Sequence, residues 1–212
     1  MELIALNTGT EDVVAVRCII DDEPVMLVDT PGFSDTNISD TEILARIARW
    51  MKDTYDNGCL LSGIIYLHRI IDPRMVGLSL KNLRMMKKLC GANSMRNVVL
   101  ATTMWERVTE EEGLRRESEL ENVFWKDMIE SGSSMTRITT EREDDARALV
   151  KSLLNNKPIS TQLQDELHSG KTLVQTAAGT EIREEMAKLE EKLRASYAAE
   201  LTELKRAQRN RE

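Results

Sequence analysis

The sequence predicts an α/β fold in which a mostly parallel sheet is covered by helices on both faces. Short apolar runs alternate with amphipathic segments over residues 1–158, which is typical of parallel strands joined by helices. The runs "GIIYL" and "NVVLA" are continuously apolar, as expected for strands that are buried on both faces. From residue 159 onward such runs disappear. The chain therefore divides into an α/β domain, residues 1–158, and a helical extension, residues 159–212.

The first expected elements are two strands and a helix. Residues 13–20 and 25–29 are β-branched and apolar, and only the short turn "DDEP" separates them. Such a connection predicts an antiparallel hairpin at one edge of the sheet. Apolar residues then recur at helical spacing from Ile43 to Met51, and Ser39 or Asp40 is placed to cap this helix.

The remaining elements of the domain alternate regularly. A buried strand is expected at 60–70, a helix at 79–91 and a second buried strand at 97–103. Thr109 and Glu112 form a capping-box pattern that opens a helix reaching about residue 129. A short strand at 135–139 and an amphipathic helix at 141–154, followed by a turn that ends in a proline, complete the domain.

Composition excludes several classes of protein. The net charge of −7 disfavours a general nucleic-acid binder, because such proteins need a basic face. No apolar run approaches the roughly 20 residues of a transmembrane helix. The N-terminus lacks the shape of a signal peptide, so we expect a cytoplasmic protein. The cysteines show no metal-binding spacing and the two histidines are far apart, so we expect reduced cysteines in the core and no Cys/His metal site.

The stretch "VMLVDTPGFSDT" places Asp29, Thr30, Pro31 and Gly32 directly after an expected strand. In α/β domains that hydrolyse nucleotides, a carboxylate at the carboxyl end of a strand faces phosphate-bound Mg²⁺, a hard cation that prefers oxygen ligands. A glycine lets the backbone N–H approach and bond a terminal phosphate oxygen. The arrangement resembles the second switch of a GTPase, which the terminal phosphate orders. The alternative is a strand that simply ends in a Pro-Gly turn.

The C-terminal segment predicts a long helix with one apolar stripe. Neither proline nor glycine interrupts residues 180–211, and apolar residues recur at spacings of three and four: Ile182, Met186, Leu189, Leu193, Tyr197, Leu201 and Leu204. The stripe either packs back on the domain or forms a coiled coil with another chain. We favour the second reading, self-association through this helix, by a small margin.

Several segments together resemble the fungal GTPase-like G-domain proteins, which are relatives of septins and of the immune-associated nucleotide-binding GTPases. The segments are "LVDTPGFSDT", "SGIIYLHRIIDPRM", "NLRMMKKLCG", "NVVLATTMWERV" and "TLVQTAAGTEI", and they span about residues 22–190. The resemblance implies a Ras-like G domain whose helical extension is prone to coiled-coil formation from about residue 180. It also implies GTP as the ligand and Mg²⁺ as the cofactor, with Asp29 as the metal ligand.

The segment that would read guanine departs from the usual N/T-K-x-D motif. Thr103 and Glu106 stand at its ends, with methionine in place of the lysine and glutamate in place of the aspartate. On this interpretation Thr103, Trp105 and Glu106 flank the base, and Trp105 stacks on it. An equally weighted alternative is that Met104 and Trp105 simply pack the loop.

A phosphate loop G-x-x-x-x-G-K-[ST] should precede residue 13, but the first twelve residues contain one glycine and no lysine. We therefore expect residues 1–158 to be a G domain that is either truncated at its N-terminus or descended from a lineage that lost the loop. A triphosphate would then lack the amides and the cation that compensate its charge. Phe33 follows Gly32, where GTPases often carry a glutamine that orients water, so we assign no catalytic residue and expect weak or absent hydrolysis. Two readings remain: a GTP-binding protein with impaired nucleotide binding, or a pseudo-GTPase scaffold that acts through its C-terminal helix.

Overall fold

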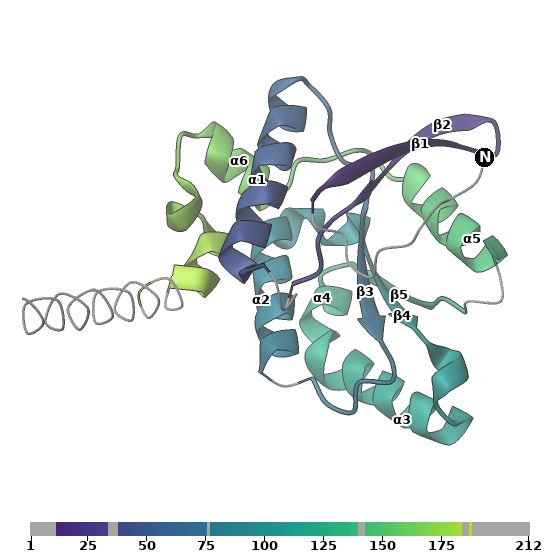
Figure 1. Cartoon of the computed structure of the whole chain (residues 1–212). Helices are drawn as coiled ribbons and strands as arrows, with labels where there is room; N and C mark the ends of the chain where they lie inside the picture. Colours follow the sequence, from purple (N-terminus) through teal and green to yellow (C-terminus); the bar gives the residue numbers. More distant parts are fainter. Residues whose placement is uncertain (1–11, 34–37, 76, 140–142, 184–186, 188–212) are drawn as a thin grey trace, which may run out of the picture.

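A β-hairpin opens the part of the chain that the computed structural model describes, which comprises residues 12–33, 38–75, 77–139, 143–183 and 187. Strands β1 (Val14–Ile20) and β2 (Glu23–Asp29) pair antiparallel over their full length (Figure 1). Asp21 and Asp22 form the turn with positive φ angles of 50° and 67°, as tight hairpin turns require. The predicted antiparallel hairpin is confirmed, but not its place at one edge of the parallel sheet: within the described residues it forms a two-stranded sheet of its own.

Three parallel strands form the second sheet. They are β3 (Ile64–Arg69), β4 (Val98–Thr103) and β5 (Ser134–Arg137), in the order β3-β4-β5. The central strand β4 is buried along most of its length, which explains why its sequence is continuously apolar. These strands confirm the prediction of a parallel sheet.

Helices connect these strands and follow the last one. They are α1 (Asp40–Asp56), α2 (Leu78–Cys90), α3 (Glu110–Glu119), α4 (Lys126–Glu130), α5 (Glu143–Leu154) and α6 (Gln162–His168). The expected caps are present: the side chain of Ser39 accepts from the N–H of Glu42, and that of Thr109 accepts from the N–H of Glu112. Gly91 ends α2 at a φ of 75°.

The prediction of one continuous helix from Thr109 to about residue 129 is wrong, because a π-helical turn (Leu120–Phe124) separates α3 from α4. At this turn the N–H of Trp125 bonds the carbonyl of Leu120, five residues back, at 2.7 Å. The wider turn places the indole of Trp125, which is fully buried, edge-on to the rings of Tyr66 and His68. Tertiary packing of one large side chain therefore outweighs regular helix geometry.

The parallel sheet lies between two helical layers. On one face, α1, α2 and α6 enclose the main core, which includes Leu44, Leu83 and Leu163. On the other face, Leu149 and Leu153 of α5 pack against β4. Figure 1 shows α5 on the opposite side of the sheet from α1 and α2. This arrangement confirms the predicted three-layer α/β fold.

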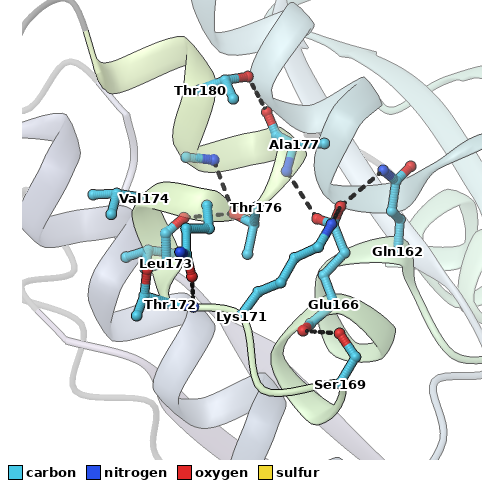
Figure 2. Close-up of polar contacts among 12 residues, drawn as sticks. Gln162, Glu166, Ser169, Lys171, Thr172, Leu173, Val174, Thr176, Ala177 and Thr180 are labelled. Atoms are coloured by element: carbon cyan, nitrogen blue, oxygen red, sulfur yellow. Dashed lines mark hydrogen bonds and ion pairs between the residues drawn. The ribbon is translucent and has the colours of Figure 1, made fainter.

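The first part of the extension packs on the main core, and the carboxylate of Glu166 joins two of its segments by hydrogen bonds (Figure 2). Glu166 accepts hydrogen bonds from the backbone N–H of Ala177 at 2.8 Å and from Nζ of Lys171 at 2.9 Å. Ala177 begins a helix, so the carboxylate also lies at a favourable end of its dipole. Ile182, the first residue of the expected apolar stripe, is fully buried in the main core. The rest of the stripe, from Met186 on, lies outside the described residues.

Other sequence predictions have different outcomes. Cys90 is buried and Cys18 is half-buried, but Cys59 is exposed in the turn after α1, so the expectation that all three cysteines lie in the core is wrong. No helix among the described residues is long and apolar enough to cross a membrane. Residues 1–11, which make up most of the segment without a phosphate-loop motif, lie outside the described residues.

Candidate functional site

The carboxyl ends of β3, β4 and β5 meet at one edge of the parallel sheet. Arg69 pairs with Thr103, and Thr102 pairs with Arg137. Beyond the strand ends, the N–H of Ile70 still bonds the carbonyl of Thr103 at 2.9 Å, and that of Ile138 bonds the carbonyl of Thr102 at 2.8 Å. The loops that leave this edge therefore start from a fixed frame, and such an edge is where open α/β sheets bind ligands.

The loop after β4 turns sharply at Met104. This residue has a left-handed backbone conformation, with φ 61° and ψ 36°, which non-glycine residues adopt only at a cost of about 1 kcal/mol or more. The turn carries the chain into the short 3-10 helix Trp105–Arg107. It presents three of the predicted site residues together, Thr103, Trp105 and Glu106.

Trp105 is held on three sides. Its Nε1–H donates to Oγ1 of Thr102 at 2.9 Å. Its ring edge lies against Gly113 of α3 so closely that a Cβ atom at residue 113 would be 2.6 Å from the indole. The guanidinium carbon of Arg137 lies over the ring, 4.1 Å from its centroid. One indole face is therefore occupied by a side chain of this same chain.

Arg137 is itself fixed by Glu117 of α3. Its Nε donates to Oε1 of Glu117 at 2.7 Å, and Nη2 donates to Oε2, which makes the pair bidentate. The hydrogen bonds to this carboxylate are the main cause of the raised pKa of Arg137. No motif in the sequence singles out Arg137; the only signal is a basic residue in the middle of the short strand expected at 135–139.

The other predicted residues of this loop are less constrained. The side chain of Glu106 is 39% exposed, and its nearest cation is Nε of Arg107 at 3.9 Å. The hydroxyl of Thr103 donates to the carbonyl of His68 at 3.4 Å, a long hydrogen bond. Glu106 is therefore accessible to a ligand, whereas Thr103 helps to join the ends of β3 and β4.

The segment Asp29 to Gly32 leaves the other sheet. Asp29 is the last residue of β2 and is exposed, Thr30 is also exposed, and Pro31 is buried. At Gly32 an added Cβ atom would meet nothing within 4 Å, and the residue has no positive φ. Neither the backbone conformation nor the packing of the described residues requires glycine at this position. The backbone of Gly32 is, however, open to the close approach of a ligand.

A small pocket at the end of β3 is a separate feature. His68, Asp72 and Arg116 are among the residues that line a cavity of about 10 Å³, the space of about one water molecule. Burial lowers the pKa of His68, which is only 7% exposed. Nη1 of Arg116 donates to the carbonyl of Ile70 at 2.8 Å. The burial of His68 and its edge-on contact with the ring of Trp125 indicate a structural role for this histidine.

The residues present fit a magnesium nucleotide only in part. The described residues contain no group of three or more histidine, cysteine or acidic side chains that would hold a metal alone. The exposed carboxylate of Asp29 suits Mg²⁺, which commonly takes one or two carboxylates and completes its shell with phosphate oxygens and water. Any magnesium at this place would depend on the nucleotide that brings it.

Comparisons with known proteins show the fold. No family model and no curated protein matches the sequence. The solved structure of Toc33 from Arabidopsis thaliana in complex with GDP and Mg²⁺ superposes with a TM-score of 0.57 at 13% identity, over 75% of this chain and 77% of that chain. Toc33 with Mg²⁺ and GMPPNP gives a TM-score of 0.54 at 14% identity, over 72% and 73%. A dimerization-deficient mutant of Toc33 gives 0.53 at 13% identity, over 68% of each chain. The chain therefore has the fold of a Ras-like G domain.

Proposed function

We propose that this chain is a GTPase-like G-domain protein, related to septins and immune-associated nucleotide-binding GTPases, that binds guanine nucleotide weakly and with Mg²⁺. The observation that carries the proposal is the end of β2. There an exposed carboxylate, Asp29, is followed by Gly32, an open glycine that its own backbone does not require. The likeness to Toc33, which has been solved with GDP and Mg²⁺, supports it.

In this proposal the segment after β2 binds the metal and the phosphate, and the loop after β4 binds the base. Asp29 holds Mg²⁺ through water, and the N–H of Gly32 bonds the terminal phosphate, with Thr30 and Pro31 shaping the turn between them. Thr103, Trp105 and Glu106 flank the guanine, and the carboxylate of Glu106 accepts hydrogen bonds from its N1–H and amino group. The domain carries these residues, and the extension from residue 159 supports it.

The affinity expected of residues 1–212 is low because these residues contain no G-x-x-x-x-G-K-[ST] motif. Without its lysine and its row of amides, the triphosphate has few compensating charges. Phe33 packs against the main core and has no polar group to orient water, so hydrolysis by this chain is expected to be weak or absent.

Titration calorimetry with a non-hydrolysable GTP analogue tests the proposal. Asp29→Asn should abolish the difference between titrations with Mg²⁺ and with EDTA, because it removes the proposed metal ligand. Asp144→Asn, an exposed aspartate on α5, is the matched control and should behave as wild type. Binding that is indifferent to both Mg²⁺ and Asp29→Asn would contradict the proposal.

A second candidate, an interaction scaffold without nucleotide, is favoured by one observation. Large apolar side chains are exposed on both strands of the hairpin: Val14, Val16, Ile19, Met26 and Leu27. The expected self-association through the C-terminal helix belongs to the same reading. Because Ile182 is part of the core, the test is sedimentation of the full chain against a chain that ends at Arg183. A monomeric mass for both would remove self-association through the tail.

A further inference from the structure

The position of Arg137 beside the proposed base site is the starting point. Arg137 lies next to Thr102 in the register of β4 and β5, one residue before Thr103. Its guanidinium covers one face of Trp105. A base that reaches the loop after β4 therefore meets Arg137 on that side of the indole.

The guanidinium presents a flat surface that is already fixed. Its Cζ atom lies over the Trp105 ring, 4.1 Å from the centroid, and Nε and Nη2 both donate to the carboxylate of Glu117. The side chain is nevertheless 42% exposed. With the indole on one side and Glu117 bound through Nε and Nη2, the side of the guanidinium turned away from the indole is the place left for a ligand to approach.

We propose that this outer face of Arg137 is the surface on which the purine ring stacks, so that Trp105 supports the arginine and is not itself the stacking residue. The inference rests on the proposed function. Guanidinium groups are weakly hydrated and stack on aromatic planes, and nucleic-acid bases are among the rings they accept. The indole behind the cation strengthens the arrangement through its electron-rich face.

Arg137 should bind a base more tightly than an unrestrained arginine would, because its side chain is ordered before the base arrives. A free arginine loses much of its side-chain rotational entropy when a ligand orders it. Glu117 and Trp105 have already ordered this one in the absence of ligand. The exposed carboxylate of Glu106 lies on the same loop as Trp105 and remains available for the polar edge of the base.

The test measures GDP binding with Mg²⁺ by saturation-transfer NMR and by titration, methods that detect millimolar affinities. Arg137→Lys keeps a cation beside Glu117 but loses the plane, so the dissociation constant should rise about tenfold and saturation transfer to the guanine H8 should fall. Arg137→Ala should do at least as much. Arg115→Lys, an exposed arginine on α3, is the matched control and should leave both unchanged.

The outcomes separate the two proposals. If wild type binds GDP and Arg137→Lys binds it equally well, with unchanged transfer to H8, the stacking role is refuted and the proposed function stands. If wild type shows no transfer from GDP at all, the proposed function and this inference both fail. The melting temperature of each variant shows whether it is folded, and Arg137→Lys serves if Arg137→Ala does not fold.

Discussion

Lys81 places its Nζ atom 2.9 Å from Oδ2 of Asp40, and this ion pair joins the first residue of α1 to the first turn of α2. The two side chains are only 13% and 7% exposed. Removing one partner of a buried pair takes away close compensation for the charge of the other, which is costly. Both helices cover the same face of the parallel sheet, so the pair fixes the N-terminal ends of α1 and α2 to each other.

Lys81→Met should therefore lower the free energy of unfolding by about 3 kcal/mol. The matched control is Lys52→Met, which breaks the exposed pair of Lys52 with Asp56 and should lower the free energy of unfolding far less, because solvent screens this pair. Urea denaturation of both variants measures the difference. Equal losses would show that the Asp40–Lys81 pair contributes no more than a surface contact.

Gly113→Ala tests the packing of Trp105 through the sign of the change in the free energy of unfolding. Alanine favours helix over glycine by about 1 kcal/mol, so an exposed site would be stabilised. Here the new methyl group would meet the indole at 2.6 Å, so we expect destabilisation by about 1–3 kcal/mol. In a Trp105→Leu background, where the clash is relieved, the same substitution should be neutral or stabilising. Destabilisation in both backgrounds would contradict this view of the loop.

The buried His68 should make the free energy of unfolding depend on pH. Burial lowers its pKa in the folded state, so unfolding takes up a proton when the pH lies between the folded value and 6.5. The histidine therefore contributes stability that is fully present above pH 6.5 and is lost as the pH falls through this window. His68→Gln should flatten the profile there. An NMR titration of wild type that gives His68 a pKa at or above 6.5 would refute the assignment.

Glu166 should anchor the extension. Its carboxylate binds the N–H of Ala177 and Nζ of Lys171, and together with a contact from Gln162 these interactions outweigh burial and lower its pKa. Its contribution is present above the unfolded value of about 4.5 and is lost as the pH falls through the folded pKa. Glu166→Gln keeps an acceptor but removes the charge, so amide exchange at residues 178–182 should accelerate at neutral pH. Unchanged exchange would show that the apolar contacts of Ile182 suffice.

Local signals in the sequence predicted most of the fold. Ser39, Thr109 and Gly91 mark helix ends through contacts with their own neighbours, and the apolar runs of β3 and β4 indicate burial without further information. The π-helical turn before Trp125 was not predictable, because it exists to place an indole against residues from another element.

The candidate site shows the same division. Asp29 and Gly32 follow from a short motif. In the structure Asp29 ends β2, which belongs to a different sheet from β3, β4 and β5, and the role of both residues stays a prediction. Arg137 and Glu117 are 20 residues apart, and only the pairing of β4 with β5 and the packing of α3 bring them to Trp105. A sequence pattern contains no information about which face of Trp105 is covered.

The most direct test of the central claim is the amide resonance of Gly32 during a titration with GTP and Mg²⁺. Our account predicts a saturable shift with a dissociation constant on the order of a millimolar, and a smaller shift with GDP, which lacks the terminal phosphate. A Gly32 resonance that does not move while other residues respond, or that moves equally with both nucleotides, would contradict it.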